Sequence, residues 1–278
     1  MFNSKRLLRE FKHYSLQDSK CLYNALSTAQ LDYIEKYNVD ITSIVSIPSL
    51  AFKIFRLNYL EVNIPLLSKI NDRLIRRSYF GGATDIYKCY GENLYYIDVN
   101  SLYPFAMCKP MPLNLVRSYN SISANNVNIN KFFGFLEVDI ECPDSVLRPV
   151  LTYRFKGKTI FPRGLFTGVY FSEELKAVLP IGYKILKIHS AKQFDKSDLF
   201  TGYVNQMYHT KMSSTGSQRW LAKLLLNSLY GLFGRKQEII ESVTINKSDI
   251  HKYILTNIIK TVIDIDENSI LIKNIEIK

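Results

Sequence analysis

Hydrophobic residues recur along the first half of this chain with two periods, one typical of helices and one typical of strands. Apolar side chains three and four residues apart predict one or two helices over 7–36 and further helices over 49–60 and 66–79. From Ala83 the period changes to alternation, which predicts strands, among them one over 132–140. Glu137 and Asp139 share a face of that strand, and we favour a solvated face over the alternative that they are charged neighbours of Asp98.

The second half of the chain repeats the same two periods. Expected elements follow in the order strand 183–194, helices 198–211 and 217–230, strand 238–245, helix 248–259 and a hairpin over 260–277. A further helix is predicted from Ser172 to Pro180, after a basic hairpin around Gly157. The mixture of helices and hairpins predicts an α+β fold.

The stretch 94–107 predicts an apolar strand that ends in a carboxylate and is followed at once by a Ser-Leu-Tyr-Pro turn. Residues 91–93 would turn a hairpin whose second arm is this strand, and Pro104 prevents the strand from continuing as a central one. Asp98 would then be held at a strand end, where it and the Val99 carbonyl could bind Mg²⁺ that also contacts a polyphosphate. One carboxylate rarely suffices for such a site, so a second must come from elsewhere.

The charge balance narrows the class of partner. Lys and Arg number 36 against 25 Asp and Glu, which gives a formal net charge of +11 and a pI near 9.3. This excess favours a polyanion, either nucleic acid or an anionic membrane surface, although a basic protein without such a partner is the alternative. No apolar run reaches the roughly 18 residues that a spanning helix needs, so we expect no membrane span.

Four cysteines, Cys21, Cys89, Cys108 and Cys142, are too widely spaced for a Cys-x-x-Cys metal site or a disulfide framework. They are expected to be reduced thiols in or near the core.

Three short patterns carry candidate binding chemistry. On the helix over 217–230, two cations, an amide and a phenol share one face opposite the apolar side Leu221, Leu224, Leu225 and Leu229; they are Arg219, Lys223, Asn227 and Tyr230. Such a face can bind phosphates and recognise a base or sugar, or it can be an ordinary surface.

The paired glycines of Tyr79-Phe-Gly81-Gly82 allow a nucleic-acid backbone to approach closely. Tyr14 and Asp18 lie one helical turn apart, which taken alone favours a core tyrosine and a solvated acid.

Taken in order, Tyr-x-Gly-Gly (79–82), Asp-x-x-Ser-Leu-Tyr-Pro (98–104) and Lys-x-x-x-Asn-Ser-x-Tyr-Gly (223–231) resemble the signature of family B DNA polymerases. The resemblance is to the protein-primed branch of organellar and viral enzymes, of the linear mitochondrial plasmid type. Tyr14-Ser-Leu-Gln-Asp18 resembles the third exonuclease motif of that family. The resemblance therefore covers nearly the whole chain.

The resemblance implies a role for each matching residue. Asp98 would be one of two palm carboxylates of a two-Mg²⁺ catalytic site, with the Val99 carbonyl as a further ligand. Tyr103 would be the steric gate that selects dNTPs over ribonucleotides. The remaining dNTP-binding set would be Leu102, Lys211, Arg219, Lys223, Asn227 and Tyr230, and the DNA-binding set Tyr79, Gly81, Gly82, Ser101 and Gly231. Tyr14 and Asp18 would be an exonuclease remnant.

The same resemblance implies a layout. The order would be the end of an exonuclease domain with linker helices (1–70), palm (71–115), a palm insertion that handles a priming terminal protein (116–196), fingers (197–235) and the start of a return to the palm (236–278). The C-terminal palm and thumb would be missing, as would the first two exonuclease motifs, so proofreading is not expected. Because the third polymerase motif, Tyr-x-Asp-Thr-Asp, is not found, a separate C-terminal polymerase fragment is an expected partner beside template–primer DNA and dNTPs. Asp264 and Asp266 are rejected as that motif, since the Tyr and Thr are absent.

Three functions follow as hypotheses. The first is a DNA-directed DNA polymerase, incomplete in this chain and located in the mitochondrion as an organelle-encoded or linear-plasmid product. The second is a catalytically inactive remnant that binds DNA or the terminal protein. The third is a generic basic RNA-binding protein, in which Tyr103 would have no part in sugar selection.

Overall fold

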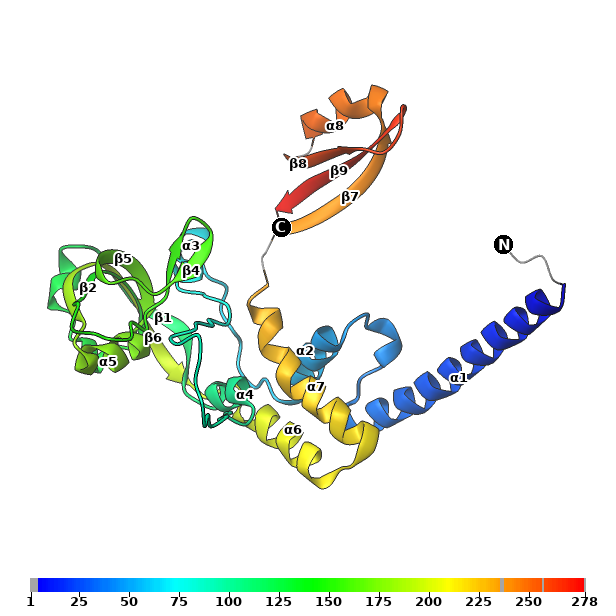
Figure 1. The fold of residues 1–278 in the computed structure, drawn as a ribbon, viewed down its shortest axis with the longest axis horizontal. Coiled ribbons are helices and arrows are strands. Elements are labelled where there is room, and N and C mark those ends of the chain that lie inside the picture. The colour runs from blue at the N-terminus through cyan, green and yellow to red at the C-terminus, as the bar shows by residue number, and fades with distance from the viewer. Residues whose placement is uncertain (1–4, 236–237, 257, 278) are drawn as a thin grey trace. The chain divides into compact units, whose positions relative to one another are not determined.

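The structure is a computed structural model that describes residues 5–235, 238–256 and 258–277. The chain forms two compact units, one up to Leu229 and one from Tyr230 (Figure 1). Helix α7 (Gly216–Phe233) contains the boundary between them. Among the described residues, no helix is both long and apolar enough to cross a membrane.

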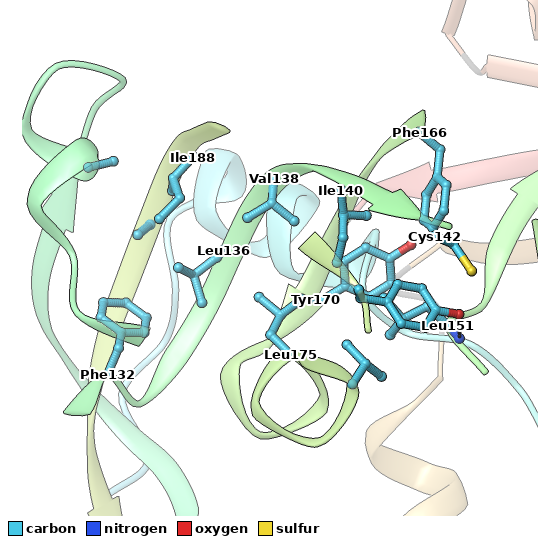
Figure 2. Packing of buried hydrophobic residues seen from close by; sticks show 14 of the residues in the cluster. Phe132, Leu136, Val138, Ile140, Cys142, Leu151, Phe166, Tyr170, Leu175 and Ile188 are labelled. Atoms are coloured by element: carbon cyan, nitrogen blue, oxygen red, sulfur yellow. Dashed lines mark hydrogen bonds between the residues drawn. The ribbon is translucent and has the colours of Figure 1, made fainter. Parts of the chain in front are cut away.

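A four-stranded antiparallel sheet forms the larger core of the first unit. Its strands run in the order β1-β6-β2-β5 and comprise β1 (Met111–Tyr119), β2 (Gly134–Cys142), β5 (Gly164–Phe171) and β6 (Lys184–Ser197). Alternate residues of β2 are buried, as its sequence predicts, so that Leu136, Val138 and Ile140 face the core (Figure 2). Tyr170 from β5 and Leu175 from helix α5 (Ser172–Val178) complete this cluster. Glu137 and Asp139 lie on the opposite, polar face, as expected.

Smaller elements connect the strands of this sheet. The hairpin of β3 (Tyr153–Phe155) and β4 (Lys158–Ile160) stands between β2 and β5 in the sequence. Single 3₁₀ turns cover Ser123–Asn126, Ile129–Lys131 and Leu179–Ile181.

Helices make the second core of the first unit. They are α1 (Lys5–Tyr37), α2 (Ile47–Asn58), α6 (Thr201–Ser213) and α7, with a 3₁₀ turn at Ile41–Ser43 between α1 and α2. Ser46 begins α2 because its hydroxyl accepts a hydrogen bond from the Ser49 amide. The ring of Phe55 stacks on that of Phe200, with centroids 5.0 Å apart. The Tyr203 hydroxyl donates to the Leu225 carbonyl at 2.9 Å, which ties α6 to α7 inside the core, and burial there raises the pKa of Tyr203.

The second unit contains a three-stranded antiparallel sheet in the order β7-β9-β8. Its elements are β7 (Glu238–Asn246), a 3₁₀ turn (Lys247–Asp249), α8 (Ile250–Thr256), β8 (Ile258–Asp264) and β9 (Ser269–Ile277). Ile270 and Ile272 of β9 are its buried side chains among those described. The predicted strand, helix and hairpin of this region are confirmed.

Most of the predicted elements are present, including a single helix α1 over the first predicted range and α3 (Lys69–Arg76) within the third. The predicted strand over 94–99 is wrong, and so is the hairpin around 91–93. Every residue from 81 to 100 is exposed and none of them lies in a regular strand. A strand needs a hydrogen-bonded neighbour, and no strand in the described ranges pairs with this segment. Strands β1 and β5, the short helix α4 (Leu102–Met107) and the 3₁₀ turns were not predicted.

All four cysteines are free, but only Cys142 is buried in the core. Cys108 is half-buried, whereas Cys21 and Cys89 are exposed. The expectation of core or near-core thiols is therefore wrong for those two, which lie on α1 and in the irregular segment before residue 94.

Candidate functional site

The turn after Asp98 is held in shape by a short helix. Ser101 adopts a left-handed conformation with φ of 53°, and its carbonyl accepts the first hydrogen bond of α4, from the Phe105 amide at 2.9 Å. Pro104 fits because the first turn of a helix uses no amide hydrogen there. Its ring is buried, whereas Asp98 and Tyr103 are exposed on the surface of the turn. The buried Pro104 ring therefore anchors the turn, while Asp98 and Tyr103 face solvent.

Two contacts bring distant segments to this turn. The Lys211 ammonium, in the last turn of α6, donates to the Ser101 hydroxyl at 3.4 Å. The Tyr103 hydroxyl lies 3.5 Å from the point that a Cβ on Gly82 would occupy. Three segments thus meet at this turn: 79–82, 98–104 and α6. Lys211 and Ser101 are 110 positions apart in the sequence.

On α7 the predicted polar face is confirmed for Arg219, Lys223 and Asn227, which are all exposed. The opposite side is buried, but its members differ in part from those expected: Ala222, Leu225, Leu226 and Leu229 are buried, whereas Leu221 and Leu224 are only partly so. Tyr230 is half-buried and begins the second unit, and Gly231 lies inside α7, so the helix continues past its predicted end.

The donor atoms near Asp98 suit a hard cation. Mg²⁺ prefers oxygen ligands, keeps several waters and is commonly held by one or two carboxylates together with substrate phosphates. The exposed Asp98 carboxylate and the adjacent Val99 carbonyl would supply two of these oxygen ligands. In the described part of the chain, no three His, Cys, Asp or Glu side chains gather closely enough to hold a metal ion, so these residues do not form a complete cage.

Asp264 and Asp266 have structural partners in the second unit. The Asp264 carboxylate pairs with the Lys247 ammonium at 2.9 Å. Asp266 accepts hydrogen bonds from the amides of Asn268 and Ser269, at 2.8 and 2.6 Å, and these bonds lower its pKa. Asp266 thus stabilises the β8–β9 turn, and Asp264 pairs with the 3₁₀ turn that follows β7. These partners support the rejection of the two acids as a metal-binding pair.

Tyr14 and Asp18 lie on α1, and both are exposed. The interpretation of Tyr14 as a core residue is wrong, because 64% of its surface is open to solvent. A role as an exonuclease remnant stays a prediction.

Sequence reasoning missed the polar contacts that attach residues 77–80 to the sheet. Arg77 pairs with Glu137 at 2.7 Å, and Arg154 donates to the Tyr79 carbonyl at 3.2 Å. Arg77 directly follows α3, and its ion pair holds it against the polar face of the sheet. No local pattern could have found these partners, since 60 and 75 positions separate them.

The model of the family "DNA polymerase type B, organellar and viral" matches residues 2–276. A probable DNA polymerase of Neurospora intermedia is 34% identical over 97% of this chain, and one of Podospora anserina is 34% identical over 96%. The DNA polymerase of Bacillus phage Nf is 25% identical over 66% of the chain.

Among solved structures, Phi29 DNA polymerase in complex with primer-template DNA and incoming nucleotides matches with a TM-score of 0.59 at 19% identity. The match covers 79% of this chain and 40% of the Phi29 chain, and it shows a shared fold. The chain spans 29% of the length of the Neurospora relative and 22% of the Podospora relative.

Proposed function

Because the chain belongs to the organellar and viral family of type B DNA polymerases, we propose that it supplies the nucleotide-selecting part of a DNA-directed DNA polymerase. The reaction would be templated dNTP addition, in which the primer 3′ oxygen attacks the α-phosphate and pyrophosphate leaves. The observation that carries the proposal is the convergence of Gly82, Tyr103, Ser101 and Lys211 at one turn beside Asp98.

Phosphoryl transfer needs mainly positioning and neutralisation of charge. In this proposal Asp98 and the Val99 carbonyl hold Mg²⁺, which supplies electrostatic stabilisation of the phosphates. Lys211 supports that task because its ammonium lies beside the turn, within 3.4 Å of the Ser101 hydroxyl. A cation at that distance can neutralise a triphosphate bound over the turn.

Tyr103 is proposed as the group that selects the sugar. Tyr103 is 46% exposed on the surface of the turn, in the same motif as Asp98. A phenol ring in this place would occupy the volume of a ribose 2′ hydroxyl, while Leu102 would contribute its backbone to dNTP binding. The Tyr103 hydroxyl lies 3.5 Å from where a Cβ on Gly82 would stand, so the backbone there limits the space around the ring, as a gate that discriminates requires.

The exposed face of α7 is proposed to complete the nucleotide site. Arg219 and Lys223 would contact the triphosphate, and Asn227 with Tyr230 would line the nascent base pair. Tyr79, Gly81, Gly82, Ser101 and Gly231 would contact DNA. The high positive charge of the chain supports a polyanionic partner.

The whole enzyme would need a second polypeptide segment. The Neurospora and Podospora relatives are more than three times as long as this chain, which spans 29% and 22% of them, and a two-metal site requires a second carboxylate beside Asp98. A separate C-terminal polymerase fragment is therefore part of the proposal, as are a priming terminal protein on residues 116–196 and a mitochondrial location, both supported by the organellar and viral family. The alternative is an inactive remnant that retains only binding to DNA or to the terminal protein.

The test compares binding with catalysis in the purified 278-residue chain. We expect it to bind a fluorescent template–primer and, in that complex, the complementary dNTP in preference to a mismatched one. Extension of the primer with Mg²⁺ is expected to be weak, and addition of the C-terminal part of the Neurospora relative is expected to raise it. Template-directed extension overturns the remnant alternative, whereas a chain that binds template–primer without any preference for the complementary dNTP overturns the polymerase proposal.

A further inference from the structure

We propose that the four-stranded sheet positions the Tyr79–Gly82 segment through two arginine anchors, so that Glu137 and Arg154 are positioning residues for the contact of that segment with DNA. The inference rests on the proposed function for its DNA-binding consequence. The anchoring itself rests on contacts within the first unit.

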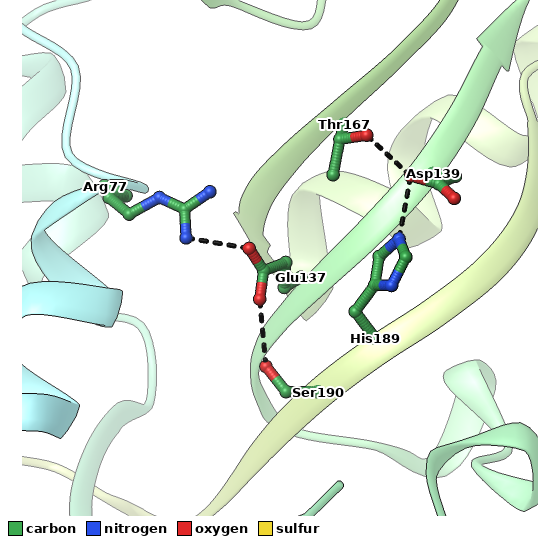
Figure 3. Close-up of polar contacts among 6 residues, drawn as sticks. All are labelled: Arg77, Glu137, Asp139, Thr167, His189 and Ser190. Carbon is green, nitrogen blue, oxygen red and sulfur yellow. Dashed lines mark hydrogen bonds and ion pairs between the residues drawn. The ribbon is translucent and has the colours of Figure 1, made fainter. Parts of the chain in front are cut away.

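The first anchor is the ion pair between Arg77 and Glu137. Arg77 follows the last turn of α3, and its Nη1 lies 2.7 Å from Glu137 Oε1 in the middle of β2 (Figure 3). The second carboxylate oxygen of Glu137 accepts a hydrogen bond from the Ser190 hydroxyl of β6 at 3.4 Å. Glu137 is thus oriented by two neighbouring strands, and its side chain is 22% exposed.

The second anchor is Arg154 on β3. Its Nη2 donates to the Tyr79 carbonyl at 3.2 Å, and its guanidinium lies 5.4 Å from the centroid of the Phe80 ring. The hairpin that carries Arg154 is itself fixed to the core, because the Tyr170 hydroxyl donates to the Thr152 carbonyl at 2.9 Å. Arg154 therefore ties the backbone at Tyr79 to the hairpin, which is itself tied to the sheet.

Between the anchors the segment does not pack tightly on the sheet. A cavity of about 220 Å³ lies there, lined by Arg77, Phe80, Tyr153, Arg154 and residues 167–170. Dense apolar packing would hold the segment whatever the polar contacts did. With a cavity beneath it, the segment depends on the two arginines for its place.

The consequence reaches the candidate site within two residues. Gly82 lies two residues after Phe80, and a Cβ at Gly82 would lie 3.5 Å from the Tyr103 hydroxyl. A displacement of Phe80 would move the paired glycines relative to the turn that carries Asp98. Both arginine contacts are partly exposed, so they contribute little to global stability and their loss can be studied in a folded chain.

A charge-matched pair of variants separates anchoring from electrostatics. Glu137→Arg and Glu141→Arg add the same positive charge to the same polar face of β2, and Glu141 pairs with Lys184 at 3.7 Å, away from the segment. Added positive charge alone tightens binding to DNA. We expect Glu141→Arg to bind template–primer as tightly as the unchanged chain or more tightly, and Glu137→Arg to bind about fivefold more weakly.

Rescue and a local readout complete the test. The double variant Arg77→Glu/Glu137→Arg restores an opposite-charge pair and is expected to recover most of the lost affinity. The amides of Ser78 and Tyr79 donate to the carbonyls of Ile75 and Arg76 at 2.9 and 3.2 Å. Hydrogen exchange at these two amides should quicken in Glu137→Arg and in Arg154→Met, but not in Glu141→Arg. Equal exchange at Ser78 and Tyr79 in all of these variants would overturn the anchoring.

The exchange measurement requires no DNA, so it distinguishes the two proposals. If exchange at Ser78 and Tyr79 quickens as expected but the unchanged chain binds no template–primer, the anchoring stands and the proposed function fails. If the unchanged chain binds template–primer and Glu137→Arg matches Glu141→Arg in affinity, the positioning role for DNA contact is overturned while the proposed function stands.

Discussion

The Tyr103 hydroxyl lies 3.5 Å from the position of a Cβ on Gly82. Because glycine has no Cβ, the backbone at residue 82 borders the phenol ring and leaves room there for one methyl group. The two residues are 21 positions apart in the sequence and belong to different motifs, 79–82 and 98–104. This backbone and the ring together define how much space lies over the turn after Asp98.

This contact predicts a graded effect of side-chain size at position 82 on sugar selection. Gly82→Ala should leave the ratio of dATP to ATP affinity in the template–primer complex nearly unchanged, because its Cβ has room. Gly82→Val branches towards the Tyr103 hydroxyl and should displace the ring, which would reduce the ratio by roughly tenfold, the scale of one misplaced group in a pocket. The measurement is competitive nucleotide binding, with Tyr103→Ala as the reference for a lost gate. A ratio that stays unchanged in Gly82→Val would contradict this role of residue 82.

Local periodicity was enough to predict the elements whose burial follows from their own sequence. The alternation of β2 and the apolar side of α7 are examples, since each places its core residues on one face by geometry alone. The segment 94–99 shows the limit of that reasoning. Its alternating apolar residues are typical of a strand, yet 92% of Tyr95 and 96% of Tyr96 are exposed, because a strand is defined by a neighbour that the segment's own sequence does not specify.

The candidate site shows a second limit. The residue types at Asp98, Tyr103 and Lys223 could be recognised from motif spacing, but contacts between distant segments could not. Pro104 was interpreted as the end of a strand, whereas in the structure it lies in the first turn of α4. The partners of Arg77 and Arg154 depend on how the sheet folds back beside α3, which no short-range pattern records.

Lys211 offers a test of charge near the turn. Lys211→Met removes the ammonium that donates to the Ser101 hydroxyl while keeping the length of the side chain. Loss of one charge-assisted contact should weaken dNTP binding by about tenfold, and Lys211→Arg should retain much of it. Template–primer affinity should change less than dNTP affinity in both variants. Isothermal titration with the complementary dNTP gives the comparison, with the exposed Lys187→Met on β6 as a charge-matched control.

Asp139 predicts a dependence of stability on pH. Hydrogen bonds from the Thr167 hydroxyl at 2.6 Å and from His189 at 2.8 Å lower the pKa of Asp139 below its ordinary value. A carboxyl whose pKa is lower in the folded state stabilises that state above the unfolded pKa, and this stabilisation is lost as pH falls through the folded pKa. Thr167→Val should therefore lower the unfolding free energy at neutral pH by less than about 1 kcal/mol, given the exposure of the pair. The difference should shrink in acid, as measured by urea unfolding across the range; a difference that grows in acid would contradict this sign.

Leu136 predicts how strongly the sheet core stabilises the first unit. Its side chain is fully buried at the centre of β2. Leu136→Ala should lower the unfolding free energy by about 2–5 kcal/mol, because it removes buried methyl groups and leaves a cavity. Leu165→Ala on β5, where 67% of the leucine is exposed, should change it by no more than about 0.5 kcal/mol. Urea unfolding followed by circular dichroism measures both, and similar losses in the two variants would show that β2 does not carry the core.

Asp98, Asp264 and Asp266 can be separated by metal binding without any requirement for turnover. The carboxylate of Asp98 is exposed on the turn, while Asp264 pairs with Lys247 and Asp266 accepts two amide hydrogen bonds. In the complex with template–primer and dNTP, Asp98→Asn should therefore weaken Mn²⁺ binding, because one oxygen ligand loses its charge. Asp264→Asn should leave Mn²⁺ affinity unchanged. Asp266→Ala should do the same while it destabilises the second unit through the loss of its turn hydrogen bonds. Electron paramagnetic resonance titration of Mn²⁺ gives the affinities, and a loss in Asp264→Asn equal to that in Asp98→Asn would reinstate Asp264 as the second carboxylate of the site.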